Sequence, residues 1–235
     1  MEIAICLLTS EQNHLEEWLD HHINKGFKDF IIFRDRFDFL YGEKYQNVNI
    51  IDEYIETPNE VRFQMDLYLK VCKKHKYDYI LFIDSDEYLE LSEEYSSIQD
   101  FILKFRRKHP NFDGIGINWR MYGDNDMVKT RNSVDSYIKY YRDDHIKTLV
   151  DPSKVKIFMD PHLPTLNNKS HILNEKGEKI ATPIKTHSSD SIWIKHLWTR
   201  SLEEWKIKVQ RRGWYQFYDR KMEQFYEYNN KCTNI

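Results

Sequence analysis

Short apolar runs alternate with amphipathic segments along the first half of the chain. Each run holds four to seven mostly apolar residues, a length typical of a buried β-strand. The predicted strands cover residues 2–8, 30–33, 48–51, 79–83 and 113–119. Between them, apolar residues recur every three or four positions, which is the spacing of one helix face. This alternation predicts an α/β domain with a mainly parallel sheet flanked by helices.

Local signals indicate where two of the helices begin or end. Residues 9–12 read Thr-Ser-Glu-Gln, which is a capping box for the first helix, and Gly26 is a plausible C-terminal cap for it. Residues 57–60 read Thr-Pro-Asn-Glu, which combines an N-cap, a proline in the first turn and a glutamate three residues later. A further helix is expected over residues 97–108, with its apolar positions facing inward.

The second half of the chain is less regular. Residues 137–142 and 154–159 are strand candidates, and a hairpin turn is expected at 175–178, where the sequence reads Glu-Lys-Gly-Glu. The sequence becomes helical again from Ser201. Because there is no internal repeat or linker-like stretch, we expect one domain over residues 1–213. A C-terminal helical tail over 214–235 is expected to pack on that domain or on a partner chain.

Composition and charge narrow the class of protein. The formal net charge is −3 and the isoelectric point is about 6.4, so a nucleic-acid-binding surface is not indicated. Cys6, Cys72 and Cys232 form no Cys-x-x-Cys pair, which favours a reducing compartment over a disulfide framework. No apolar run approaches the ~18–20 residues of a membrane helix. We therefore expect a cytoplasmic protein with weak or no attachment to the periphery of a membrane.

Two carboxylates directly follow the apolar strand at 79–83. Alternate side chains at a strand end point to the same side, so Asp84 and Asp86 can converge while Ser85 points away. Ligands of open α/β sheets bind beyond the carboxyl ends of the strands. Paired carboxylates suit Mg²⁺ or Mn²⁺ with diphosphate oxygens completing the shell. The alternative is an ordinary solvated turn, in which aspartate is common.

Six segments in the same order resemble one family. They are 17–22 (Glu-Trp-Leu-Asp-His-His), 82–89 (Phe-Ile-Asp-Ser-Asp-Glu-Tyr-Leu), 119–123 (Trp-Arg-Met-Tyr-Gly), 147–152 (Lys-Thr-Leu-Val-Asp-Pro), 196–205 (His-Leu-Trp-Thr-Arg-Ser-Leu-Glu-Glu-Trp) and 208–213 (Lys-Val-Gln-Arg-Arg-Gly). Together they resemble the family-2-like glycosyltransferases of the GT-A fold, particularly the DUF23-type branch. The resemblance implies a Rossmann-like GT-A sheet over about residues 1–213.

The resemblance also implies roles for site residues. Asp84 and Asp86 correspond to the metal and diphosphate site, and His196 to a further ligand brought in from the C-terminal region. An imidazole ligand favours Mn²⁺ slightly over Mg²⁺. The chain departs from the family at Asp35. The acidic residue that recognises the base of the nucleotide is expected here, but Asp35 lies between two arginines. It departs again at Arg200, where the family has lysine.

Other residues are candidates for contacts with the donor. Thr9 ends the first strand, and its alternative role is a helix cap. Arg62 and Gln64 start the helix before the metal strand and are expected either to touch the donor or to be solvated. Trp119 suits stacking on a sugar ring, and equally suits the core. His162 and His187 are kept as reserve candidates for the metal.

A base is needed to take the proton of the acceptor hydroxyl. Asp124 and Asp126, just after the Trp-Arg-Met-Tyr-Gly element, are the candidates, although Gly-Asp-Asn-Asp is also a strong turn composition. The predicted function is a metal-dependent, inverting glycosyltransferase that moves a sugar from a nucleotide sugar, expected to be a UDP-sugar. The acceptor is expected to be a glycan, a lipid-linked sugar or a protein, and a homo-oligomer is possible.

Two alternatives remain open. A haloacid-dehalogenase-type phosphatase also places an Asp-x-Asp after a buried strand, with the first aspartate as nucleophile. That motif normally continues into Gly or Thr, whereas Glu87 and Tyr88 follow here. The other alternative is a degenerate transferase fold that only binds a glycan or a partner protein. The presence of both aspartates and His196 argues against it.

Overall fold

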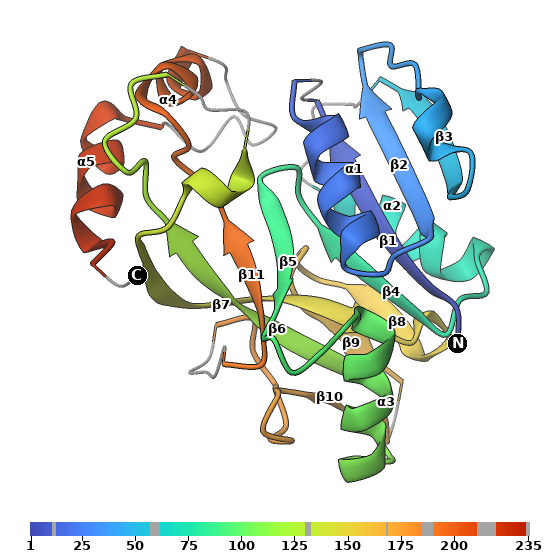
Figure 1. Cartoon of the computed structure of the whole chain (residues 1–235). Coiled ribbons are helices and arrows are strands. Elements are labelled where there is room, and N and C mark those ends of the chain that lie inside the picture. Colours follow the sequence, from blue (N-terminus) through green and yellow to red (C-terminus); the bar gives the residue numbers. More distant parts are fainter. Residues whose placement is uncertain are drawn as a thin grey trace.

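The fold is a mixed α/β architecture in which helices flank a large curled sheet (Figure 1). The computed structural model describes residues 1–10, 13–56, 62–129, 133–167, 169–184, 190–210 and 220–233. Within these residues there is a nine-stranded sheet and a two-stranded sheet. The predicted Rossmann-like GT-A fold class is confirmed.

The N-terminal half of the large sheet is entirely parallel. Its strands are β1 (Ile3–Thr9), β2 (Asp29–Asp35), β3 (Asn49–Ile55) and β4 (Tyr79–Ile83). They lie in the order β3-β2-β1-β4. The chain therefore adds β2 and β3 on one side of β1 and returns to place β4 on the other. This reversal creates a switch point at the carboxyl ends of β1 and β4.

The other half of the sheet mixes strand directions. Strand β7 (Tyr140–Val150) runs antiparallel between β4 and β6 (Gly114–Tyr122). Strand β11 (Ile192–His196) is parallel to β6, and β5 (Glu87–Leu91) is antiparallel to β11. The short strand β10 (Ile172–Leu173) pairs with the start of β6. Because only β7 and β5 oppose the rest of this sheet, it is mainly parallel, as predicted.

Two hydrophobic layers cover the two faces of the sheet. On one face, Ile5 and Leu7 of β1 pack with the helices α1 (Leu15–Asn24) and α3 (Ile98–Lys108). On the other face, Cys6 belongs to the cluster that holds α2 (Phe63–Lys74). Because alternate residues of a strand point to opposite faces, a fully apolar β1 is what a sheet covered on both sides requires.

The smaller elements lie around these layers. The two-stranded sheet consists of β8 (Val155–Phe158) and β9 (Pro164–Leu166), and β8 packs near α2. Within the described part of the chain, 3₁₀ turns are formed by Glu43–Tyr45, Val134–Ser136 and Pro152–Lys154.

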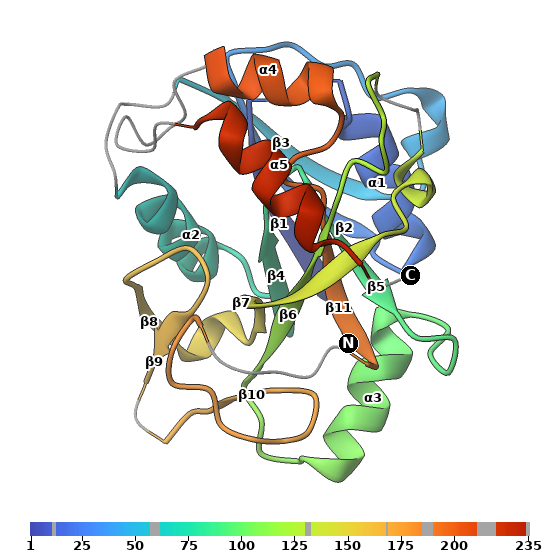
Figure 2. The ribbon, with the colours of Figure 1, turned by 90° about the vertical axis from the view of Figure 1, so that its left-hand side faces the viewer.

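The C-terminal part forms two helices, α4 (Leu202–Gln210) and α5 (Met222–Lys231), that lie against each other (Figure 2). Trp205 of α4 is fully buried, and its ring packs on Trp198 and Phe225. Asn229 of α5 accepts a hydrogen bond from the backbone N–H of Asp124. Helix α5 thus packs on this same chain. The predicted boundary at residue 213 falls within 211–219, outside the described residues, and stays a prediction.

Local predictions had mixed outcomes. The capping box at residues 9–12 is wrong, because Thr9 remains in β1 and the residue before α1 is His14, which makes no side-chain cap. Gly26 follows α1 at φ +99°, where an added Cβ would lie 2.5 Å from Gln99 Oε1, so the predicted glycine stop is confirmed. The start signal at 57–60 lies outside the described residues.

The predictions for the second half were partly confirmed. Residues 137–142 and 154–159 overlap β7 and β8, and Gly177 takes the left-handed φ of +84° in the predicted turn. Strands β5 and β11 were not predicted, although both border the candidate site.

Candidate functional site

The candidate site lies at the switch point of the sheet. Thr9 ends β1 and is buried, while Asp84 directly follows β4. Leu7 pairs with Ile83 across β1 and β4, and Thr9 pairs with Arg34 across β1 and β2. Thr9, Asp35 and Asp84 therefore lie at one edge of the sheet. This is where open α/β sheets bind their ligands.

Asp84 makes polar contacts with Lys147, Gln64 and Glu87. Its Oδ2 accepts a hydrogen bond from Lys147 Nζ at 2.6 Å, and its Oδ1 accepts one from Gln64 Nε2 at 3.2 Å. Its backbone N–H donates to Glu87 Oε2 at 2.8 Å. Lys147 comes from β7, the antiparallel neighbour of β4, and its side chain is completely buried. The sheet pairing thus places a lysine beneath the first aspartate.

Asp86 has a second lysine as its partner. Lys208 Nζ of α4 donates to Asp86 Oδ2 and to the carbonyl of Trp198, both at 2.8 Å. His196 Nε2 lies 3.5 Å from Asp86 Oδ1. The guanidinium of Arg200 donates to the carbonyl of Ser85 at 3.0 Å. Residues from the C-terminal part of the chain therefore enclose the Asp-Ser-Asp turn.

His196 reaches the turn because of strand pairing. It is the last residue of β11, and β11 pairs with β5 so that His196 lies opposite Glu87. The C-terminal region thereby folds back onto the carboxylates, which is the placement expected from the sequence. The role of His196 as a ligand stays a prediction.

The charges of this group are strongly coupled. Burial raises the pKa of Glu87 to about 7, although Lys147 opposes that shift. Burial would also raise the pKa of Asp86, but Lys208 and His196 hold it well below its ordinary value. For Lys147, burial would lower the pKa, but Asp84 and Glu87 raise it above its ordinary value. Lys147 and Asp86 are therefore charged near neutral pH.

Replacing Glu87 with glutamine is expected to flatten the pH dependence of stability. The pKa of Glu87 is about 7 in the folded protein, against an ordinary value of 4.5. Between these two pH values the folded protein therefore retains a proton that the unfolded chain releases. This stabilisation is complete below about pH 4.5 and is lost as the pH rises through about 7. The free energy of unfolding of the wild type should fall, on the order of 2–3 kcal/mol, between about pH 5 and pH 8.

Urea unfolding at several pH values measures this slope. The Glu87→Gln variant, whose side chain does not ionise, should show a smaller loss over the same range. The exposed Glu223 provides a control, and Glu223→Gln should keep the wild-type slope. A steep slope that survives in Glu87→Gln would assign the pH dependence to another group.

Trp119 lies among three imidazoles. Its ring centroid is 4.3 Å from that of His196, 4.9 Å from that of His145 and 5.3 Å from that of His162. Burial and the neighbouring charge of Lys147 lower the pKa of His162 to about 3, so this imidazole is neutral. Trp119 is thus packed beside the site, and its stacking on a sugar stays a prediction. His187 lies outside the described residues.

The proposed bases lie in one turn of the chain. Asp124 and Asp126 belong to a turn after β6, where Asn125 and Asp126 have positive φ. Asp124 binds Asn229 of α5 through its backbone N–H, and Asp126 lies 3.8 Å from Lys139 Nζ. These contacts do not join either aspartate to the Asp84 group. The turn interpretation describes their geometry, and their catalytic role stays a prediction.

The remaining donor candidates lie around the same edge. Gln64 touches Asp84, whereas Arg62 is the exposed residue that precedes α2. The Asp35 carboxylate is largely buried and lies 3.6 Å from Arg36 Nε. Arg34 instead forms a bidentate ion pair with Asp52.

Three residues of the site received no role from the sequence. Lys147 and Lys208 lie within the family-like segments, and Glu87 directly follows the second aspartate. A signal was present at Lys147, which interrupts an otherwise apolar stretch of β7. A buried lysine needs a carboxylate partner, but the sequence could not show which one.

The donor atoms do not fit a resident metal ion as they are arranged. Among the described residues, no group of three or more His, Cys, Asp or Glu side chains could hold one. Instead, Oδ2 of both Asp84 and Asp86 is bonded to an ammonium group. The Mn²⁺ or Mg²⁺ site stays a prediction from the sequence, whereas in the structure ammonium groups lie where its positive charge was expected.

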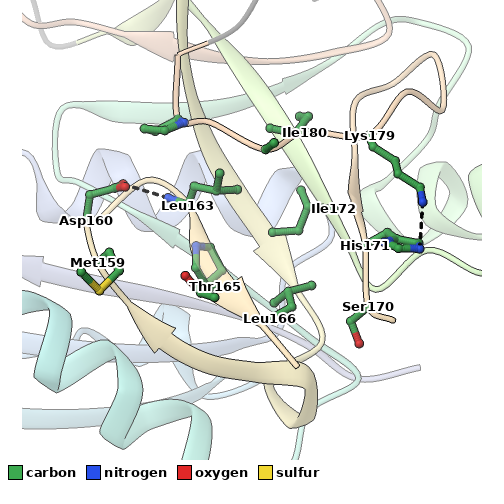
Figure 3. Close-up of a pocket in the computed structure, with 13 residues that line it drawn as sticks. Met159, Asp160, Leu163, Thr165, Leu166, Ser170, His171, Ile172, Lys179 and Ile180 are labelled. Carbon is green, nitrogen blue, oxygen red and sulfur yellow. Dashed lines mark hydrogen bonds between the residues drawn. The ribbon is translucent and has the colours of Figure 1, made fainter. Parts of the chain in front are cut away.

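A pocket of about 490 Å³ lies beside β9 and β10 (Figure 3). Its lining is mainly apolar, and on one side Lys179 donates a hydrogen bond to His171 Nε2. Asp160 and Leu163 line it, while His162 between them packs against Trp119. The pocket and the candidate site therefore share one segment of chain.

Comparisons with known proteins assign no family. No family model matches the chain, and no curated protein matches it. Solved structures that align with this chain include TarS from S. aureus in complex with UDP, with 19% identity, a TM-score of 0.41, and coverage of 52% of this chain and 36% of that one. TarS in complex with UDP-GlcNAc has 13% identity and a TM-score of 0.43, with coverage of 80% and 62%.

A third structure aligns over the whole chain. HddC from Yersinia pseudotuberculosis, complexed with GMP-PN, has 9% identity and a TM-score of 0.42, with coverage of 99% and 100%. The chain thus spans less than two thirds of both TarS chains. At these TM-scores the likeness assigns neither an activity nor a substrate.

Proposed function

We propose that this protein is a glycosyltransferase that uses a nucleotide-sugar donor. The observation that carries the proposal is the group of Asp84, Asp86, Lys147, Lys208 and His196 at the switch point of a Rossmann-like sheet. Open α/β folds bind nucleotides at such a switch point. Buried ammonium groups there supply positive charge where a diphosphate would develop negative charge.

The finer proposal is an inverting transfer from a UDP-sugar. A carboxylate removes the proton of the acceptor hydroxyl, the oxygen bonds to the anomeric carbon, and the bond to the diphosphate breaks. The diphosphate leaves with the bonding electrons, so nearby cations favour this step. The proposed acceptor is a glycan, a lipid-linked sugar or a protein, and Asp124 and Asp126 remain the proposed bases.

A panel of nucleotide sugars tests the proposal. At least one member is expected to raise the melting temperature of the protein and to be hydrolysed slowly without acceptor. A ligand present at ~100 times its dissociation constant should raise the free energy of unfolding of the protein by about 2.7 kcal/mol. The panel should be run both in EDTA and with Mn²⁺.

Sugar phosphates serve as the discriminating substrates. Release of phosphate from them, with no response to any nucleotide, would favour the phosphatase alternative instead. Binding of glycans without any response to nucleotide sugars would favour the degenerate, non-catalytic alternative. Both outcomes would contradict the proposed function.

No helix among the described residues is long and apolar enough to cross a membrane. A cytoplasmic location with weak or no membrane attachment, and self-association, belong to the same proposal.

A further inference from the structure

The carboxylates of the site already have their counter-charges within the chain. Lys147 Nζ lies 2.6 Å from Asp84 Oδ2 and 3.4 Å from Glu87 Oε2. Lys208 Nζ lies 2.8 Å from Asp86 Oδ2. Each aspartate is therefore paired with its own ammonium group before any ligand arrives.

These lysines are built into the fold rather than lying loosely over the site. The side chain of Lys147 has no exposed surface, and that of Lys208 is 9% exposed. The ammonium group of Lys147 is itself a buried charge, and Asp84 and Glu87 are its carboxylate partners. An unpaired buried charge is strongly unfavourable, so the lysine is not easily displaced.

A divalent cation would compete with both lysines. Mg²⁺ and Mn²⁺ bind through oxygen lone pairs at about 2.0–2.2 Å, and the ammonium groups already occupy one oxygen of each aspartate. A cation bound to the remaining oxygens would gain less attraction than at free carboxylates, because the ammonium groups already balance the charges of the aspartates. A phosphate oxygen, by contrast, can accept a hydrogen bond from an ammonium group.

We propose that Lys147 and Lys208 are the resident cations of this site, and that the protein binds the diphosphate of its donor without a divalent metal. The inference rests on the proposed function. Lys208 can contribute directly, because an ammonium group has three N–H donors and its described partners, Asp86 and Trp198, use two. Lys147 acts from beneath, as the positioning charge for Asp84, whose side chain is 38% exposed.

Calorimetry with UDP, GDP, CDP and ADP, in EDTA and with Mn²⁺, provides the first test. At least one of these nucleotides should bind with nearly equal affinity under both conditions. Binding that requires Mn²⁺ would overturn the inference and leave the proposed function standing. No binding of any nucleotide under either condition would overturn the proposed function, and this inference with it.

Lysine variants provide the second test. Lys208→Met should weaken nucleotide binding in EDTA by about 10- to 100-fold, the loss expected for a charged hydrogen bond. Because this change frees the Asp86 carboxylate, added Mn²⁺ should restore part of the affinity. Electron paramagnetic resonance with Mn²⁺ alone should detect binding to Lys208→Met and none to the wild type.

Lys25→Met is the matched control, since Lys25 pairs with Glu90 at 2.5 Å outside the site. It should change neither nucleotide affinity nor Mn²⁺ binding. Lys147→Met should behave as Lys208→Met does, provided that the Lys147 variant folds. If it does not fold, Lys208→Met alone tests the inference. Tight Mn²⁺ binding by the wild type, or unchanged nucleotide affinity in Lys208→Met, would overturn the inference.

Discussion

Asp86→Asn should reduce sugar transfer by about 10²–10³-fold, comparable to the loss of one preorganised electrostatic group in an active site. Asp86 orients Lys208, its partner at 2.8 Å, and lies 3.5 Å from His196. The amide retains an oxygen but carries no charge, so the ammonium and imidazole groups lose the carboxylate that positions them. The measurement is kcat/KM with the nucleotide sugar that the panel identifies.

The fold should survive this substitution, which circular dichroism can verify. Asp20→Asn provides the matched control, because Asp20 pairs with Lys44 at 3.0 Å on the surface. It should leave kcat/KM unchanged within about twofold, as expected for a surface ion pair. Full transfer activity in Asp86→Asn would remove the Asp-x-Asp turn from the mechanism, whether lysines or a metal supply the positive charge.

The second large effect is expected in stability. Trp205→Ala should lower the free energy of unfolding by about 3–5 kcal/mol, the usual cost of truncating a buried tryptophan. The indole is completely buried, packs on Trp198 and Phe225, and donates to the carbonyl of Lys221. The cavity would weaken the packing of α4 on α5 and disturb the helix that carries Lys208. Urea unfolding measures the loss.

Ile207 offers a control in the same helix. It is 47% exposed, so Ile207→Ala should change stability by about 0.5 kcal/mol or less. A small effect of Trp205→Ala would mean that the C-terminal helices unfold independently of the sheet. A large one would confirm that residues 202–210 belong to the cooperative core, as the sequence predicted.

Much of the parallel half of the fold could be predicted without coordinates. Strands buried on both faces must be apolar throughout, and β1 and β4 are the clearest examples. The position of Asp84 at the edge of the sheet follows from the same reasoning, because a polar residue directly after a buried strand marks the strand end. The sequence also located the glycine that ends α1.

Other predictions failed where pairing between strands overrode a local signal. Thr9 has the hydroxyl of a helix cap, but strand pairing with Arg34 keeps it in β1. Strand β5 reads Glu-Tyr-Leu-Glu-Leu, which is too short and too charged for its pattern to identify it. It becomes a strand because β11 pairs alongside it, and no local rule reports a partner about a hundred residues away.

The sequence by itself determined that this chain forms a mainly parallel α/β sheet with two aspartates just after β4. Burial patterns and strand ends are local properties, so they can be read along the chain. Only the tertiary structure decided what surrounds these aspartates, because Lys147, His196 and Lys208 reach them through the pairing of β7, the pairing of β11 and the packing of α4. It also placed Asp124 against α5. The charge balance of the site depends on these distant contacts, and with it the choice between a lysine and a metal ion as the source of positive charge.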